Sequence, residues 1–105
     1  HKGALNFDAD LFKELQILRK KLADQKKVPP FIVFNDVALR EMAYYFPQSL
    51  ESFQKISGVG AIKLAEYGEL FLKIIQNYAG GKQISERPIL AKYKLFKKKK
   101  KFYRK

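Results

Sequence analysis

The sequence contains no cysteine and no tryptophan, and its single histidine is the first residue. The absence of cysteine excludes a disulfide framework and a cysteine-based zinc site. A Ser–His or Cys–His pair needs a histidine or cysteine placed to act, and the chain offers neither. The phosphate-binding motif Gly-x-x-x-x-Gly-Lys-Ser/Thr is also missing. We therefore predict a domain that is not an enzyme and that holds no metal and no cofactor of its own.

Long apolar runs are missing as well. None approaches the roughly 20 residues that a membrane span needs, and the first ten residues lack the basic-then-apolar order of a signal peptide. The length of 105 residues suits one domain. A hydrophobic fraction of 47% is not that of a disordered chain. We expect a soluble, cytoplasmic protein without a membrane partner.

Acidic residues are scarce, above all in the last quarter of the chain. Residues 82–105 contain eleven basic residues against one acidic residue, a net charge of +10. Residues 1–81 contain eleven basic and nine acidic residues, a net charge of only +2. A basic tail of this kind favours polyanions, either nucleic acid or anionic lipid. The alternative is a solvated tail that serves only solubility.

Apolar residues recur at helical spacing in four places, and no stretch of useful length alternates as a strand would. Before the first of these places, Asp8 stands where an N-cap belongs and Phe7 can act as a hydrophobic staple. The apolar stripe that follows consists of Leu11, Leu15, Leu18 and Leu22. The pattern predicts an all-α bundle with helices at residues 9–25, 36–46, 50–56 and 61–78.

Proline and glycine mark the connections between these helices. Pro29-Pro30 disfavours helix, so residues 28–34 are predicted to be an extended apolar segment laid across the bundle. Pro47 is expected to end the second helix and Gly80-Gly81 the fourth. The chain then divides into an N-terminal linker or cloning remnant (1–7), a helical domain (8–80) and a basic low-complexity tail (81–105).

One candidate binding site is the turn before the fourth predicted helix. Gly58 and Gly60 let the backbone approach a phosphate closely, and the N–H groups that begin the helix are donors for it. Lys63, one turn into the helix, can pair with the same phosphate, and Lys55 lies nearby in sequence. The turn resembles the hairpin of helix-hairpin-helix DNA-binding elements. The alternative is a tight turn between helices with Val59 packed inward.

A second candidate site joins the first helix to the proline segment. Lys20, Lys26, Lys27 and Phe31 lie within twelve residues. Cations that follow a backbone beside a ring on which a base stacks are typical of single-strand binding without sequence preference. The alternative is that Phe31 belongs to the core and the lysines only solvate the first helix.

Taken in order, several of these segments resemble an HRDC domain (helicase and RNase D C-terminal), most closely that of bacterial RecQ-family ATP-dependent DNA helicases. The resemblance covers about residues 8–79. It is carried by residues 18–23, residues 28–36, Leu39, Met42, Ala43, Phe46, Pro47, residues 56–60, Lys63, Leu64, Tyr67 and Gly68. The resemblance implies a compact bundle of four or five short helices. It also implies that an aromatic residue after the two prolines, usually tyrosine and here Phe31, contributes to DNA binding.

The function implied by the resemblance is that of an accessory domain that binds single-stranded or partly duplex DNA and modulates substrate choice. ATP and Mg²⁺ would belong to the helicase core of the same chain, which would be a second partner. The resemblance further implies a monomer in the bacterial cytoplasm, associated with the nucleoid. Three alternatives remain: a substrate-positioning domain of an RNase D-like exonuclease, a protein-interaction module that docks on the helicase core, and a surface binder that acts through its tail alone.

Overall fold

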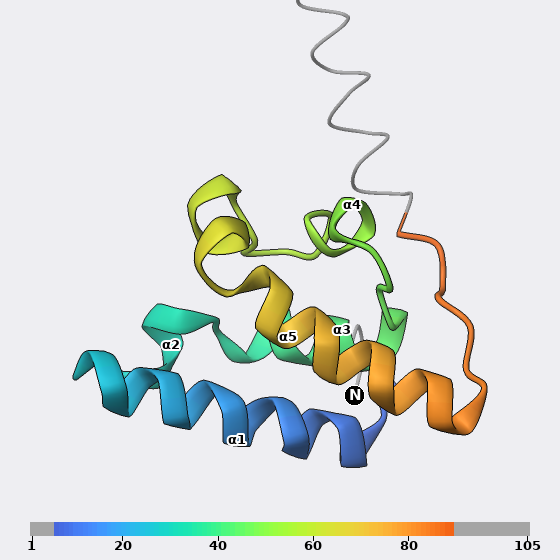
Figure 1. Ribbon diagram of the computed structural model, residues 1–105, viewed down its shortest axis with the longest axis horizontal. Coiled ribbons are helices and arrows are strands. Elements are labelled where there is room, and N and C mark those ends of the chain that lie inside the picture. Colours follow the sequence, from blue (N-terminus) through green and yellow to red (C-terminus); the bar gives the residue numbers. More distant parts are fainter. Residues whose placement is uncertain (1–5, 90–105) are drawn as a thin grey trace, which may run out of the picture.

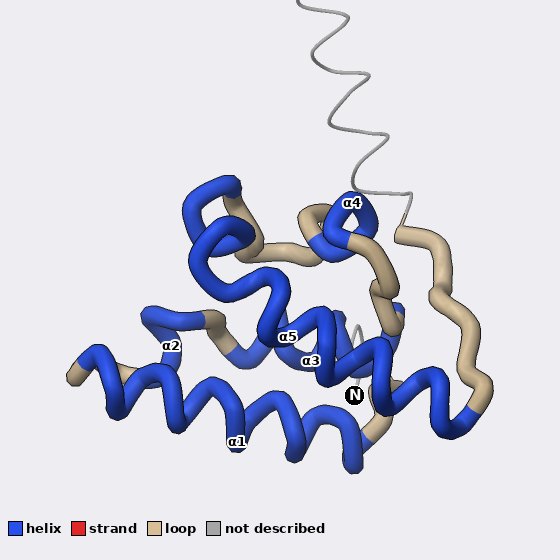
Figure 2. The backbone as a smooth tube through the Cα atoms, viewed as in Figure 1, coloured by secondary structure: helices blue, strands red, loops and turns tan. Residues whose placement is uncertain are grey.

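The computed structural model describes residues 6–89 of the chain, and within this range it consists of helices and loops without a strand (Figure 2). The helices are α1 (Ala9–Lys26), α2 (Pro30–Val33), α3 (Asp36–Tyr45), α4 (Leu50–Phe53) and α5 (Ala61–Lys82). The two long helices, α1 and α5, form one side of the bundle, and the short helices lie against them (Figure 1). The all-α prediction is confirmed.

Helix α1 begins as the sequence predicted. The Asp8 carboxylate accepts a hydrogen bond from the Leu11 N–H at 3.0 Å, which satisfies one of the free donors of the first turn. The rings of Phe7 and Phe12 lie 4.9 Å apart, the contact of a hydrophobic staple. Leu11 and Leu15 are fully buried, whereas Leu18 and Leu22 pack at the margin of the core.

The proline segment differs from the prediction, because residues 30–33 form the short helix α2 rather than part of an extended segment. Pro29 is the extended N-cap, with ψ at 150°, and Pro30 is the first helical residue. Proline fits this position because its N–H would have no helical partner there and its φ is already helical. Phe34 then returns to extended geometry, with φ at −150°, and ends the helix.

The two middle helices are slightly shorter than predicted. Helix α3 ends at Tyr45 because Phe46 adopts the left-handed conformation with φ at 51°. Helix α4 is a single turn that ends at Phe53, not at residue 56, and a capping box between Ser49 and Ser52 begins it. Leu50, the first residue of α4, keeps 38% of its surface exposed.

Helix α5 passes through Gly80-Gly81, where the sequence predicted its end, and finishes at Lys82. The left-handed residue that closes it is Gln83, whose N–H donates to the backbone of Ala79 and Gly80. Gly68 lies where α4 meets α5: a Cβ there would come within 3.3 Å of the Leu50 side chain. The absence of a side chain at Gly68 thus permits the close approach of α4 and α5.

Residues 83–89 run back along the bundle from the end of α5 toward α4 (Figure 1). The Arg87 N–H donates to the carbonyl of Tyr45 at 2.7 Å, and the Glu86 carboxylate accepts from the Ser52 hydroxyl at 2.9 Å. Ile89 is buried and Ile84 partly buried against the core. The expected boundary after residue 80 therefore falls inside α5. The basic segment from residue 90 onward lies outside the described residues.

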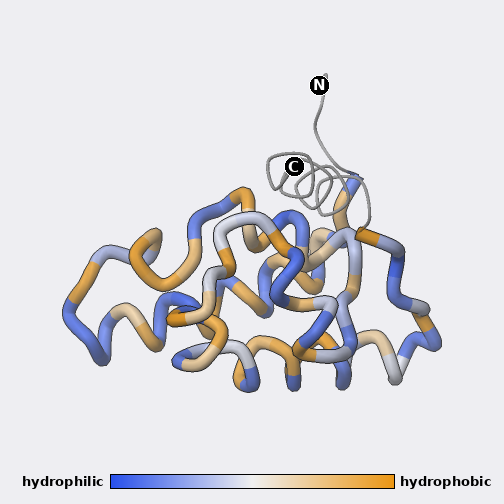
Figure 3. The backbone as a smooth tube through the Cα atoms, turned by 90° about the horizontal axis from the view of Figure 1, so that it is seen from above, coloured by the Kyte–Doolittle hydropathy of each residue, from blue (hydrophilic) through white to orange (hydrophobic). Residues whose placement is uncertain are grey.

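The core is built around Phe34, which is fully buried. Its ring makes edge-on contacts with Phe53 of α4 and with Tyr67 and Phe71 of α5, at centroid distances of 6.0, 5.9 and 4.9 Å. Apolar and polar residues alternate along the helices (Figure 3), and the buried apolar residues of α1, α3 and α5 form one core cluster with Phe34. The aromatic contacts hold α4 and α5 to the α2–α3 junction.

A hydrogen bond between the two ends of the fold joins Tyr78 of α5 to the N-cap of α1. The Tyr78 hydroxyl donates to the Asp8 carboxylate at 2.7 Å. Burial alone would raise the pKa of Asp8, but the hydrogen bonds from Tyr78 and from the backbone outweigh it and hold this pKa below its usual value of 3.8. Burial and the neighbouring Asp8 carboxylate raise the pKa of Tyr78.

We expect Tyr78→Phe to lower the free energy of unfolding by about 1 kcal/mol near neutral pH, because the variant cannot donate this hydrogen bond to a charged acceptor. Since the folded-state pKa of Asp8 is depressed, the stability it supplies is complete above pH 3.8 and is lost as the pH falls through the folded value. Urea unfolding at pH 7 and at acid pH, with ¹³C NMR titration of the Asp8 carboxyl, checks this. An unchanged Asp8 pKa in the variant would show that Tyr78 is not its cause.

Candidate nucleic-acid interface

Phe31 projects from α2 into solvent with 61% of its surface exposed. It borders an open hollow of about 530 Å³ whose other walls are Arg19, Pro30, Asn35, Asp36 and Val37. The alternative that Phe31 is a core residue is therefore excluded by its position. A ring exposed beside an open hollow has a free face on which a planar group can stack.

Arg19 fixes the segment that carries this ring. Its guanidinium donates to the carbonyl of Phe34 at 3.0 Å and pairs with the Asp36 carboxylate at 2.8 Å. Only 11% of the Arg19 side chain is exposed. Because both partners lie at the α2–α3 junction, Arg19 of α1 locks that junction and so sets the direction in which α2 presents its residues.

The three lysines that the sequence grouped with Phe31 have different surroundings in the structure. Lys20 pairs with Asp24 on the surface of α1 at 3.0 Å. Lys26 reaches α5, where its Nζ lies 3.4 Å from the Glu66 carboxylate and 5.2 Å from the ring centroid of Tyr67. These contacts with Tyr67 and Glu66 raise the pKa of Lys26, so its charge persists across the physiological range. Lys27 is exposed, and in the described range no carboxylate pairs with it.

The turn before α5 has an exposed backbone at both of its glycines. Gly58 has φ at +84°, a conformation that side chains disfavour. Gly60 is the N-cap of α5, has no side-chain hydrogen bond to the first turn, and has open space where a Cβ would lie. Side chains cap α1, α3 and α4. The backbone donors at the start of α5 therefore lack the internal acceptor that those three helices have.

A buried carboxylate on α3 is hydrogen-bonded to this turn. Glu41 of α3, almost wholly buried, accepts hydrogen bonds from the Ser57 N–H and the Ser57 hydroxyl, both at 2.9 Å. Val59 packs inward, as the alternative reading of the turn supposed. The inward Val59 and the exposed glycines are compatible, so the turn is both a packed connection and an open backbone surface.

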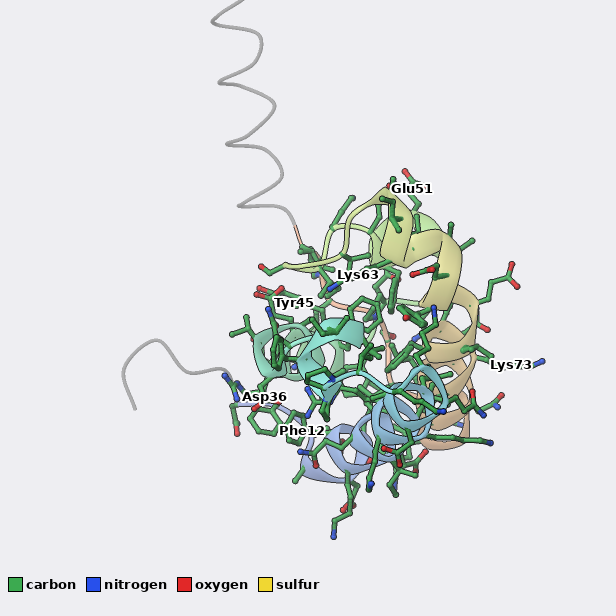
Figure 4. The ribbon with its side chains drawn as sticks, turned by 90° about the vertical axis from the view of Figure 1, so that its left-hand side faces the viewer. Phe12, Asp36, Tyr45, Glu51, Lys63 and Lys73 are labelled. Carbon is green, nitrogen blue, oxygen red and sulfur yellow. The ribbon has the colours of Figure 1, made fainter. Side chains whose placement is uncertain are left out.

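The two candidate sites meet at one pair of rings. The Lys63 ammonium lies 6.0 Å from the ring centroid of Phe34, and Lys26 lies over Tyr67, whose ring contacts Phe34. Lys63 is directed into the space between α2 and the start of α5, whereas Lys73 extends outward from the far side of α5 (Figure 4). Lys55, half-buried, follows α4 at the other side of the turn. The sequence had treated Lys26 and Lys63 as parts of separate sites.

Three residues of this region escaped the sequence reasoning. Arg19 was not a candidate site residue in the sequence, yet it borders the Phe31 hollow. Glu41 follows an arginine on a polar stretch of α3, and no motif marks it as a clamp for the turn. Tyr67 was named only among the residues that carry the family resemblance, without a role. In each case the functional contact joins residues far apart in the chain, which a local pattern does not reveal.

Two classes of site receive no support from the described residues. Among residues 6–89 no three histidine, cysteine or acidic side chains come together where they could hold a metal ion. None of the helices in this range is long and apolar enough to cross a membrane.

Comparison with known proteins gives a consistent picture. The family model of the HRDC domain matches residues 8–75. The ATP-dependent DNA helicase RecQ is 48% identical over 77 residues in Haemophilus influenzae and 43% identical over 77 residues in Bacillus subtilis, in both cases across 73% of this chain. The ATP-dependent DNA helicase UvrD2 of Mycobacterium tuberculosis is 32% identical over 73 residues, across 70% of this chain. The chain spans only 12%, 13% and 10% of these relatives' lengths.

A solved structure agrees in fold. The third HRDC domain of D. radiodurans RecQ is similar with a TM-score of 0.64 and 30% sequence identity. The similarity covers 67% of this chain and 92% of that domain. The sequence and the fold thus point to the same kind of domain.

We expect Glu41→Ala to lower the free energy of unfolding by about 2 kcal/mol, because the Ser57 N–H and hydroxyl lose a charged acceptor in a buried place. Chemical denaturation measures this loss, and amide exchange at residues 57–60 shows whether the turn itself loosens. Glu51→Ala, at an exposed carboxylate on α4, is the control. A Glu41 variant as stable as this control would contradict the clamp.

Proposed function

The chain belongs to the HRDC domain family, and on that premise we propose that it is a DNA-binding accessory domain of a RecQ-type ATP-dependent DNA helicase. The family match bears out the expected accessory domain, which does not itself catalyse a reaction. Its ligand would be single-stranded or partly duplex DNA, and binding would modulate the substrate choice of the parent enzyme. The helicase core, with its ATP and Mg²⁺, lies in the rest of the parent chain and is a second partner. We place the protein in the bacterial cytoplasm, at the nucleoid, as a monomer.

The exposed ring of Phe31 is the observation that carries this proposal. A phenyl ring with more than half of its surface free, on a segment locked by Arg19, meets the needs of base stacking. Stacking uses the face of the base and needs no hydrogen bond to its edge, so it suits a strand of any sequence. Phenylalanine keeps this face and lacks the hydroxyl of the tyrosine that the resemblance implies at the position.

Phosphate contacts would come from the cations around the two rings and from the start of α5. Lys26 and Lys63 approach the same aromatic pair from α1 and α5. Lys20, Lys27 and Lys55 are the further cations of the proposed interface. The exposed backbone at Gly58 and Gly60 leads into the first turn of α5, whose N–H groups are donors for a phosphate oxygen. Such contacts position a strand without reading its bases.

The relatives favour a helicase over a nuclease as the parent. The RecQ and UvrD2 relatives are both named as ATP-dependent DNA helicases. An RNase D-like exonuclease would instead carry a carboxylate two-metal centre upstream, so the sequence that precedes this domain in its parent separates the two. A protein-interaction module would show no DNA affinity at low salt. A binder that acts through the tail alone would be indifferent to Phe31.

We expect Phe31→Ala to weaken binding of a labelled oligothymidine by about tenfold, because one stacked base is worth roughly 1–3 kcal/mol. Fluorescence anisotropy at low salt measures this change. Phe31→Tyr keeps the ring and should bind as the wild type does. Ile17→Ala, on α1, is a matched control because Ile17 is 65% exposed. Affinity that is equal in Phe31→Ala and Ile17→Ala would remove the stacking role.

We expect Lys63→Gln to make the log–log dependence of affinity on salt shallower by about 0.7, because the variant neutralises one phosphate fewer on a single strand. Lys73→Gln serves as the control, since Lys73 points away from the proposed interface (Figure 4). Both variants remove one charge, so a general effect of net charge changes both slopes equally. Equal slopes in the two variants would place the phosphate contacts elsewhere on the domain.

A further inference from the structure

An apolar groove with an acidic border lies between α4 and the first half of α5, and the proposed DNA contact at Phe31 is not among its walls. Its volume is about 460 Å³. The walls include Leu50 of α4, Val59 of the turn, and Leu64 and Leu70 of α5, and Leu70 is 48% exposed. The charged residues that line it are Glu66 and Glu69, with no lysine or arginine among its walls.

The two carboxylates make the part of the groove at Glu66 and Glu69 unsuited to DNA, although Gly60, another of its walls, belongs to the proposed phosphate contact. Glu66 shares its carboxylate with Lys26, but in the described range no basic side chain pairs with Glu69. A phosphate backbone would be repelled by these carboxylates. A segment that combines apolar side chains with cations would match both the walls and the border.

The C-terminal segment of this chain has that composition. Residues 90–105 contain nine basic residues and no acidic residue, with Leu95-Phe96 placed between Lys94 and Lys97. The long stems of lysine cover apolar surface while the ammonium group stays with a carboxylate or with water. The segment thus offers side chains for an apolar groove and charges for its rim.

The segment also begins beside α4, the helix that supplies one wall of the groove. Glu86 accepts hydrogen bonds from the backbone N–H of Gln48 at 2.7 Å and from the Ser52 hydroxyl, at the start of α4. Ile89, the last described residue, is only 6% exposed, and the chain ends its described course next to α4 (Figure 1). Helix α4 supplies one wall of the groove and is only about 6 Å long. The seven residues from Leu90 to Phe96 span up to about 23 Å when extended, which is enough to reach it.

We propose that residues 90–105 dock in the α4–α5 groove of their own chain. Leu95 and Phe96 lie against the wall made by Leu50, Leu64 and Leu70, and lysine ammonium groups pair with Glu69 and Glu66. The proposal does not depend on Phe31 or on stacking, although Gly60, a wall of the groove, and Glu66, the partner of Lys26, adjoin the proposed phosphate contacts. Three features support it: an unfilled apolar groove, carboxylates on its rim, and a basic aromatic segment of the same chain that starts beside α4.

The full 105-residue chain allows a direct test, because it contains no natural cysteine. A nitroxide attached to Lys97→Cys broadens the amide signals of residues close to it in a ¹⁵N-labelled sample. We expect strong broadening at Leu50, Gln54, Ala65 and Glu69, and none at Lys13 and Ile17 of α1. Broadening at Phe31 in place of the groove, or no broadening at all, would overturn the proposal.

Charge and apolar contact are tested by variants of the labelled chain. Glu69→Lys should reduce the broadening at the groove at least about threefold, and Leu70→Asn should do the same. Glu14→Lys makes the same charge change at an exposed position of α1 and should leave the broadening intact. Equal effects of Glu69→Lys and Glu14→Lys would mean that net charge, not this groove, attracts the segment. The amide spectrum of each variant reports directly whether it is folded.

A mixed sample separates an occupant from the same chain from one in a second copy. Spin-labelled protein without ¹⁵N is added to ¹⁵N-labelled protein without the spin label. We expect no broadening at the groove in this mixture. Broadening there would show that the segment of another molecule fills the groove, and the proposal for the same chain would be wrong.

Discussion

The contacts of Phe34 hold together the elements that carry the candidate interface. Its ring packs edge-on against Phe53, Tyr67 and Phe71, from α4 and α5. Its carbonyl accepts the hydrogen bond from Arg19 of α1. One residue between α2 and α3 therefore ties three other helices to the segment that presents Phe31. Such a small domain has a single core, so the positions of its surface groups depend on the packing of this one cluster.

The opposite directions of Phe31 and Phe34 follow from the shortness of α2. Residues three apart in a continuous helix share a face, so a longer helix would have turned both rings to the same side. Phe34 is extended, with φ at −150° and ψ at 143°, and this change of backbone sends its ring inward while Phe31 stays outside. The Arg19 contact with the Phe34 carbonyl holds that geometry. One helical turn with an extended residue at each end thus places Phe34 in the core and Phe31 in solvent.

Local signals predicted the start of a helix where capping chemistry and apolar spacing agreed, as at Asp8. They failed where tertiary contacts decided the outcome. Pro29-Pro30 was interpreted as a helix breaker, although proline is favoured in a first turn. Gly80-Gly81 did not end α5, because Tyr78 bonds to Asp8 and the Ile84 N–H returns to the carbonyl of Ala79, which hold the last turn in place. Neither contact is visible in a window of sequence.

The electrostatics of the interface depend on which partner each basic side chain has. The number of lysines in the sequence does not give these partners. Residues 6–89 carry twelve basic and ten acidic residues, so the folded part has little charge to attract DNA from a distance. Lys20 and Lys26 are paired with Asp24 and Glu66, but surface pairs of this kind contribute little and are readily screened. A phosphate can replace those carboxylates with little loss. Arg19 differs, since it is enclosed and bound to a backbone carbonyl, and releasing it would free the α2–α3 junction. The exposed lysines are therefore the groups that can exchange partners, and the arginine is the one that must stay for Phe31 to remain in place.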